Sequence, residues 1–266
     1  MRLSGGTDTA PTTYAWAVHA AALSVRAGRH VAVDGLDLAL GTGVHGLVGP
    51  NGAGKTTLIR AIATVTAPAG GRLALLGEPV GHRADLRRVR RRLGYLPQHF
   101  GYYPRFTVRE FVEYVAWLKE MPKDRIPGAA QRAIDRVGLA DRAGSRLRTL
   151  SGGMLRRAGI AQAVVNDPEV LLLDEPTVGL DPEQRLDFRE LLRDIGSDSC
   201  VLVSTHLVED VAAACSDVVL LNDGHLVWQG TPVQLAERGG DGDPGDSAIE
   251  RGYSALLRTH RQLTGR

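Results

Sequence analysis

The length, composition and charge of the chain are those of an ordinary globular protein. Its 266 residues can bury a full hydrophobic core, in one large domain or two small ones. With 43% hydrophobic residues, 23% charged residues and a net charge of +2, nothing points to nucleic acid as a partner. No run of about 18 apolar residues and no signal-peptide pattern is present, so we expect a cytoplasmic protein.

The first part of the chain predicts a tail followed by strands. Residues 1–15 mix Gly, Thr, Pro and Ala without periodicity, which is typical of a disordered tail. Short apolar segments at 23–26, 31–33 and 36–40 are separated by Gly and Asp, and they predict an antiparallel β layer. A buried strand is expected next, at 44–48.

The segment after this strand has the pattern of a phosphate-binding loop, Gly-x-x-x-x-Gly-Lys-[Ser/Thr]. It consists of Gly49, Pro50, Asn51, Gly52, Ala53, Gly54, Lys55, Thr56 and Thr57. The glycines free successive backbone N–H groups to surround a polyphosphate, and Lys55 offsets part of its charge. Apolar residues at helical spacing follow, so we expect the N-terminus of a helix to point at the same anion.

Residues 99–150 change in character and predict a helical insert. Thr107 and Glu110 have the spacing of a capping box, and apolar residues at helical spacing follow them. Four aromatic residues crowd the entrance to the insert, namely Phe100, Tyr102, Tyr103 and Phe106. Core packing is the better explanation for each one alone, but together, beside the polar Gln98, they are suited to line a docking groove.

Two apolar runs in the second half predict central parallel strands with polar residues at their C-terminal ends. Residues 170–173 are followed by Asp174 and Glu175, which places two carboxylates at the edge where such sheets bind ligands. Residues 201–204 are followed closely by His206. We therefore expect acidic and imidazole side chains at one sheet edge.

Glycine and polar residues mark the remaining boundaries. Ser151, Gly152 and Gly153 open a helical segment, whose N-terminus is a second anion site in a chain with one phosphate loop. The sequence Asn-Asp-Gly at 222–224 predicts a hairpin turn. Residues 238–266 read as a flexible linker rich in Gly and Asp, followed by a helix.

Together these motifs resemble the ATP-binding cassette, the nucleotide-binding subunit of ABC transporters. Six motifs come in the family's order and spacing: Walker A at 49–57, the Q-loop at Gln98, the signature at 150–153, Walker B at 170–175, the D-loop at 179–181 and the switch histidine at 204–206. The signature is what separates this family from other phosphate-loop proteins. The resemblance covers about residues 23–232.

The resemblance implies an α/β fold with a P-loop NTPase parallel-sheet core, an antiparallel β layer and a helical subdomain insert. The implied boundaries are a tail at 1–15, a cassette at 16–237 and a linker with a C-terminal helix at 238–266. Within the cassette, the RecA-like core and β layer take 16–98 and 151–237, and the helical subdomain takes 99–150.

The resemblance also implies which residues hold ATP and Mg²⁺. Lys55 and the backbone N–H groups of residues 52–57 are expected to bind the phosphates. Thr56, Asp174 and Gln98 are the expected ligands of Mg²⁺, Asp174 through water.

Three residues are the expected catalytic groups. Glu175 is expected to orient or deprotonate the attacking water, and His206 to hydrogen-bond the γ-phosphate. Gln98 stands where the core meets the helical insert, so it is suited to link nucleotide state to rotation of the insert.

In this family two subunits pack head to tail, and each ATP lies between the Walker A loop of one subunit and the signature of the other. The resemblance thus implies a homodimer or a paired cassette subunit, with Ser151, Gly152, Gly153 and Asp181 completing the nucleotide site. ATP then joins the closed dimer and hydrolysis releases it.

The sequence departs from the family pattern at two positions. Ala27 stands where the family has an aromatic ring that stacks on adenine, so either Tyr14, Trp16 or His30 supplies a ring or GTP is tolerated. Met154 replaces the glutamine that often follows the signature.

The function implied is that of an ATPase subunit, peripheral at the cytoplasmic face of the membrane, which drives a separate integral-membrane permease docked near residues 98–106. The Met-Leu-Arg-Arg continuation of the signature and the long tail favour a bacterial exporter. A soluble cassette ATPase that acts on ribosomes or DNA is the alternative. Such proteins usually carry two cassettes or a coiled-coil insertion, and neither is visible. A phosphate-loop kinase or GTPase leaves residues 151–153 unexplained.

Overall fold

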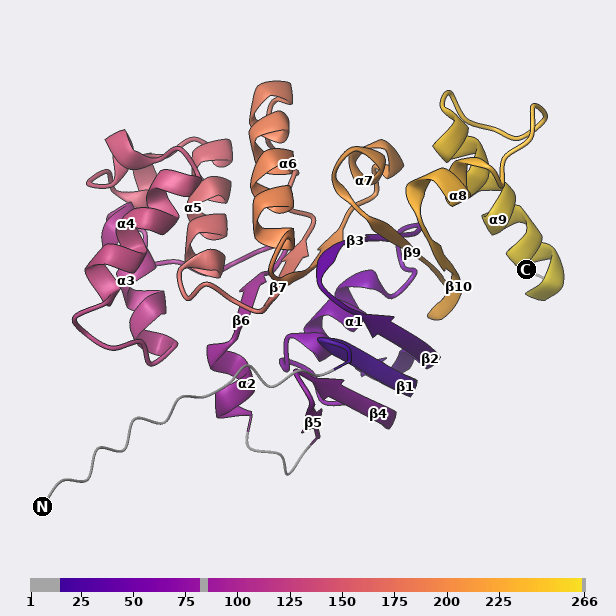
Figure 1. Ribbon diagram of the computed structural model, residues 1–266, viewed down its shortest axis with the longest axis horizontal. Helices are drawn as coiled ribbons and strands as arrows, with labels where there is room; N and C mark the ends of the chain where they lie inside the picture. The colour runs from indigo at the N-terminus through magenta and orange to yellow at the C-terminus, as the bar shows by residue number, and fades with distance from the viewer. Residues whose placement is uncertain (1–14, 82–85, 265–266) are drawn as a thin grey trace, which may run out of the picture.

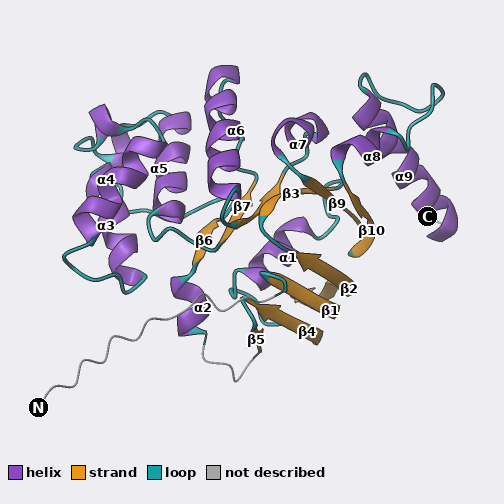
Figure 2. Cartoon of the chain, in the orientation of Figure 1, coloured by secondary structure: helices purple, strands orange, loops and turns teal. Residues whose placement is uncertain are grey.

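The computed structural model describes residues 15–81 and 86–264, which form two β-sheets and a lobe of helices (Figure 1). The central sheet separates the helical lobe from the smaller antiparallel sheet, and α8 and α9 lie at the far end from that lobe (Figures 1 and 2). This is the expected α/β architecture.

The smaller sheet is antiparallel, with the strand order β2-β1-β4-β5. Its strands are β1 (Val18–Ala27), β2 (His30–Leu40), β4 (Gly70–Leu75) and β5 (Glu78–Val80). The predicted antiparallel β layer is confirmed. The segments expected at 31–33 and 36–40 belong to one continuous strand, because β2 pairs with β1 along most of its length.

The larger sheet has the order β10-β9-β3-β8-β7-β6 and is parallel except for the β9–β10 pair. Its strands are β3 (Gly43–Val48), β6 (Leu93–Leu96), β7 (Val170–Asp174), β8 (Cys200–Ser204), β9 (Asp217–Asn222) and β10 (His225–Gly230). Side chains alternate between its faces, so Leu171 and Leu173 belong to one hydrophobic cluster and Val170 and Leu172 to the other. Both faces are covered, which explains the continuous apolar runs in the sequence.

The helices cover the two faces of this sheet unequally. They are α1 (Lys55–Ile62), α2 (Arg87–Arg91), α3 (Val108–Leu118), α4 (Ile126–Arg136), α5 (Gly152–Val164), α6 (Pro182–Gly196), α7 (Val208–Ala214), α8 (Pro232–Ala236) and α9 (Ala248–Thr264), with short 3₁₀ turns at Ala140–Arg142 and Leu147–Thr149. Helix α1 packs between the two sheets, whereas α5 and α6 lie on the opposite face. The phosphate loop therefore leads from the central sheet into a helix buried on both sides.

The helical insert forms as expected. The capping box of α3 is confirmed, since Thr107 and Glu110 each bond the other's backbone N–H. Helix α4 ends at Arg136, before Gly138, whose φ of 64° suits glycine at a chain reversal. Helix α5 contacts α3 and α4 as well as β6, so it joins the insert to the central sheet.

The C-terminal part consists of a hairpin and two helices. The predicted turn at 222–224 is confirmed, because β9 and β10 are antiparallel and joined there. The expected C-terminal helix is α9. The segment predicted as a linker forms a loop that is tied to α9 by an ion pair between Asp243 and Arg258 (3.2 Å). Among the described helices, none combines the length and the hydrophobicity that a membrane span needs.

Candidate active site

The phosphate loop is folded tightly against neighbouring backbone. Gly49 and Gly54 have φ angles of 153° and 103°, in the region that favours glycine. A Cβ atom at Gly49 would lie 2.1 Å from the carbonyl oxygen of Leu221, and one at Gly54 would lie 2.3 Å from that of Ala32. Side chains at these two positions would therefore displace the loop from β9 and β2.

The first turn of α1 is open to an anion. Its N-cap residue is Gly54, which has no side chain to bond the free backbone N–H groups, and no acidic residue occupies the turn. Lys55 is buried, and its Nζ donates to the carbonyl oxygens of Gly49 (2.6 Å) and Pro50 (3.0 Å). Burial lowers the pKa of Lys55, while Glu175 and Asp174 act to raise it. The ammonium group is thus held at the mouth of the loop.

Asp174 is the centre of a buried polar cluster at the C-terminal ends of β7 and β8. Its Oδ1 accepts from Ser204 Oγ (2.6 Å) and from Thr56 Oγ1 (3.3 Å). Its Oδ2 is buried and has no hydrogen-bond partner among the residues that the structure describes. A buried carboxylate oxygen without a donor is expected to be satisfied by a bound cation or water.

Glu175 and His206 meet beside this cluster. His206 Nδ1 lies 2.8 Å from Glu175 Oε2, and the imidazole is 52% exposed whereas Glu175 is buried. Glu175 has a φ of 51°, a left-handed conformation that is strained for a residue other than glycine. Its backbone N–H donates to Ser204 Oγ (2.9 Å). The side chain of Glu175 thus contacts His206 while its backbone is bonded to Ser204.

The residues present fit Mg²⁺ bound jointly with a polyphosphate. Within the described ranges, no three His, Cys, Asp or Glu side chains cluster as a metal site. Mg²⁺ in nucleotide sites needs only one or two protein ligands beside phosphate and water. Thr56 Oγ1 and the free Oδ2 of Asp174 are the oxygens that would hold it, and the ion would neutralise phosphate charge.

The structure unites residues that the sequence holds far apart. Thr56 and Asp174 are 118 positions apart, and Glu175 and His206 are 31 apart. They meet because β7 and β8 are adjacent and parallel, with Asp174 opposite Ser204 in register. The sequence analysis gave no role to Ser204, although its position at the end of an apolar strand is a usable signal. It also gave no individual role to Arg156, which stands beside Arg157 in a helical segment whose other residues are mostly apolar.

Known proteins match this chain in sequence. Residues 33–178 match the family profile described as ABC transporter. The chain is 38% identical to Nod factor export ATP-binding protein I of Cupriavidus metallidurans over 216 residues, which cover 79% of this chain and 69% of that protein.

The chain belongs to the ABC transporter family. It is also 38% identical to a daunorubicin resistance ATP-binding protein of Streptomyces coeruleorubidus, over 81% of this chain and 69% of that protein. A dimeric bacterial ABC transporter cassette superposes with a TM-score of 0.74 at 24% identity, covering 80% of this chain and 98% of the cassette. The ATP-binding subunit of an ABC transporter superposes with a TM-score of 0.78 at 23% identity, over 90% and 99%. These two likenesses establish the fold.

The segment predicted to be the family's signature forms the N-terminus of α5. Ser151 is the N-cap, and its Oγ accepts from the backbone N–H of Met154 (3.3 Å). A Cβ atom at Gly153 would lie 2.6 Å from Gln184 Oε1, at the start of α6. Asp181 caps α6 by accepting from the N–H of Gln184 (2.9 Å). The segments predicted to be the signature and the D-loop are therefore neighbours within this chain.

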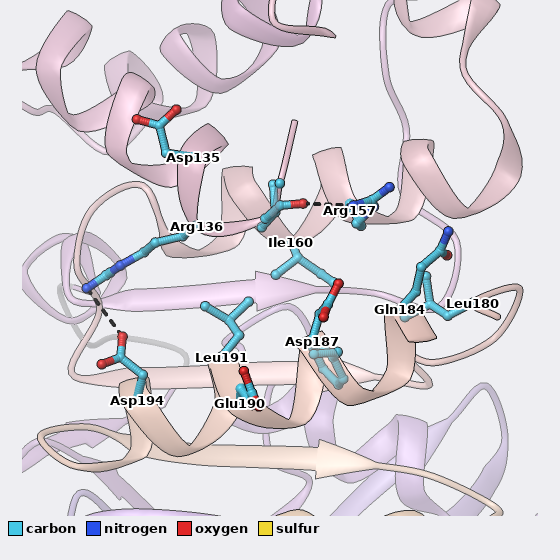
Figure 3. Close-up of a pocket in the computed structure, with 13 residues that line it drawn as sticks. Asp135, Arg136, Arg157, Ile160, Leu180, Gln184, Asp187, Glu190, Leu191 and Asp194 are labelled. Carbon is cyan, nitrogen blue, oxygen red and sulfur yellow. Dashed lines mark hydrogen bonds and ion pairs between the residues drawn. The ribbon is translucent and has the colours of Figure 1, made fainter. Parts of the chain in front are cut away.

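A cleft of about 440 Å³ lies between α5 and α6 and reaches Gln184 at the start of α6 (Figure 3). Arg157 and Ile160 of α5 line it, and Arg136 of α4 reaches across it to Asp194 of α6 (3.8 Å). The cleft between the helical lobe and α6 is thus lined by apolar side chains such as Ile160, Phe188 and Leu191, with charged groups beside them.

Gln98 is connected to the site through a backbone hydrogen bond rather than through its side chain. Its side chain is exposed, and its carbonyl oxygen accepts from Arg156 (3.0 Å). The predicted role of its amide toward Mg²⁺ stays a prediction.

The aromatic groove predicted beside Gln98 exists as a cavity of about 420 Å³. Phe100, Tyr102 and Tyr103 line it as expected, while Phe106 packs against Tyr103 beside it. Helix α3 supplies the opposite wall, which the sequence analysis missed; the residues are Phe111, Tyr114, Val115 and Leu118.

The structure separates the candidates for an adenine-stacking ring, which the sequence lacks at Ala27. Ala27 pairs with His30 where β1 turns into β2, and both are exposed. Trp16 precedes the opposite end of β1, on the order of 30 Å away at strand spacing, and packs near Gly41. Tyr14 lies outside the described residues. His30 is therefore the one of the two described rings that lies beside Ala27.

Proposed function

We propose that this chain is the ATP-hydrolysing subunit of a bacterial ABC transporter. In this proposal two copies, or one copy and a paired cassette, close around two ATP molecules and drive a separate membrane permease. The observation that carries the proposal is the sheet edge where the buried Asp174 and Glu175 meet Thr56 and His206 beside the loop of Lys55. It combines a phosphate cradle, a free carboxylate oxygen for Mg²⁺ and a carboxylate–imidazole pair at hydrogen-bond distance.

In the proposed reaction, Lys55 and the N–H groups of α1 bind the phosphates, and Mg²⁺ supplies further charge neutralisation. Glu175 accepts a proton from the attacking water while His206 orients Glu175 and contacts the γ-phosphate. Ser151, Gly152 and Gly153 of the partner subunit's α5 would present a second helix N-terminus to the same phosphate, and Asp181 would lie at that interface.

We further propose that the permease docks in the aromatic groove at the membrane and that transport is outward. The groove has the size and the aromatic lining suited to the apolar face of a short helix. The names of two relatives, which refer to export of Nod factor and to daunorubicin resistance, support the export direction.

The decisive experiment is size-exclusion chromatography of Glu175→Gln with and without Mg-ATP. We expect turnover to be lost, ATP to stay bound, and the variant to elute as a dimer only with ATP. Glu237→Gln, an exposed carboxylate in the C-terminal part, is the matched control and should hydrolyse ATP normally.

Retained hydrolysis in Glu175→Gln would eliminate Glu175 as the base. Cosedimentation of the native protein with ribosomes, and no copurification with a multi-spanning membrane protein, would favour the alternative of a soluble cassette ATPase.

A further inference from the structure

Arg156 is a buried cation whose hydrogen bonds all go to backbone carbonyl groups. It lies on α5, five residues after Ser151, and is 7% exposed. Its five N–H groups meet five acceptors: Nε donates to Pro176 O (3.1 Å), Nη1 to Pro97 O (3.1 Å) and Gln98 O (3.0 Å), and Nη2 to Asp174 O (2.6 Å) and Glu175 O (2.7 Å). The full donor capacity of a guanidinium is thus used.

The five carbonyl groups belong to two segments that leave the central sheet side by side. Residues 97–98 follow β6, residues 174–176 end β7, and these strands are parallel neighbours. Carbonyl groups beyond the last ladder bond need other partners when they are buried. Arg156 supplies them from a third element, α5, and so ties three parts of the chain together.

This arrangement fixes the strained residue of the active site. The carbonyl groups of Asp174 and Glu175 lie on either side of the Cα atom of Glu175, and both accept from the same Nη2 of Arg156. The N–H of Glu175 is held by Ser204. A non-glycine residue stays in a left-handed conformation only when its surroundings over-determine it. Arg156 and Ser204 together provide that restraint.

The charge of Arg156 suits this position. Burial lowers its pKa, while the nearby carboxylates of Asp174 and Glu175 act to raise it. A guanidinium stays protonated under such conditions. A lysine at this position has three donors without the planar fork, so it cannot reproduce the five bonds.

Helix α5 also contacts the aromatic groove. A Cβ atom at Gly159 would lie 2.6 Å from the ring of Phe100, so this ring packs directly on the helix backbone. On its other side α5 borders the cleft lined by Arg157 and Ile160 (Figure 3). The helix is therefore closely packed toward the groove and toward Arg156's carbonyl partners, and loosely packed toward α6.

We propose that Arg156 is a positioning residue for ATP hydrolysis, which holds Glu175 in its left-handed backbone conformation and ties that conformation to the Gln98 segment and to α5. The inference rests on the proposed function. A displacement of α5 would then also move the backbone of Glu175, because the guanidinium group of Arg156 is bonded to the carbonyl groups of Asp174 and Glu175.

The test compares Arg156→Lys and Arg156→Met with Arg157→Met. Arg157 is the next residue on α5 and donates to the carbonyl of Val137 (3.3 Å) on the cleft side. We expect Arg156→Lys to lower kcat about 10- to 100-fold, because small misplacement of a catalytic group has effects of this size. KM and the dissociation constant of a fluorescent ATP analogue should stay within about twofold of wild type. Arg156→Met should lose more, and Arg157→Met should be near wild type.

A second measurement separates positioning from general loss of structure. In a Glu175→Gln background, where turnover is already lost, adding Arg156→Lys should leave ATP affinity and the ATP-dependent dimer unchanged, because the residue through which Arg156 acts has been removed. Loss of that dimer or of ATP affinity, or an unchanged kcat in Arg156→Lys alone, would each overturn the inference. Inactive wild-type protein would instead refute the proposed function, and the inference with it.

Discussion

Ser204 offers a quantitative test of how the site is held together before any ligand binds. Its hydroxyl is fully buried, donates to Asp174 Oδ1 (2.6 Å) and accepts the backbone N–H of Glu175 (2.9 Å). Ser204→Ala removes both bonds and leaves the N–H group without an acceptor. An orphaned buried donor costs about 1–3 kcal/mol, and a hydrogen bond to a charged group contributes about 1.5–3 kcal/mol. We expect the free energy of unfolding to fall by about 3 kcal/mol.

Urea unfolding followed by tryptophan fluorescence measures this loss. With an m-value of about 3 kcal/mol/M, typical of larger chains, the midpoint should shift by about 1 M with m unchanged. Ser199→Ala is the matched control, because Ser199 Oγ makes one neutral bond, to Pro168 O (2.8 Å), just before the start of the same strand. Its expected loss is about 1 kcal/mol. A Ser204→Ala midpoint equal to that of Ser199→Ala would refute the reasoning.

Three further outcomes are expected. Lys55→Ala should weaken ATP binding about 10- to 100-fold in isothermal titration calorimetry, because a bond to a charged phosphate is lost. The control Lys123→Ala, at an exposed lysine, should bind ATP as the wild type does. Equal ATP affinities of the two variants would contradict the phosphate-loop assignment. Ser151→Arg should block hydrolysis but leave ATP binding by the monomer intact, and loss of both would argue against a signature that acts across a dimer. Burial, with a smaller contribution from Arg90, lowers the pKa of Lys119 from 10.5 to about 8. Between pH 8 and pH 10.5 the unfolded state binds this proton and the folded state does not. The free energy of unfolding should therefore rise with pH across this range by about 2–3 kcal/mol relative to the Lys119→Met variant. Parallel profiles of unfolding free energy against pH for the two proteins would disprove this.

Much of the fold could be predicted from the sequence, because it depends on interactions between residues that are close together along the chain. The capping box of Thr107 and Glu110, the turn at 222–224 and the loop at 49–57 are set by residues within a few positions of one another. The apolar runs at 170–173 and 201–204 likewise indicate strands buried on both faces. Shorter elements such as β5 and β6 give too few residues for a period and were not predicted.

By itself, the sequence determined which groups are candidates for chemistry: the glycines and Lys55 of the loop, and the carboxylates and imidazole that follow apolar strands. It determined them because phosphate binding and strand ends require particular residues at fixed local spacing. Only the tertiary structure decided how these groups are held. The Ser204 bonds, the five carbonyl partners of Arg156 and the α3 wall of the groove join segments tens of positions apart. Such contacts depend on which strands are neighbours and on where carbonyl groups leave the sheet, and neither is encoded by local spacing.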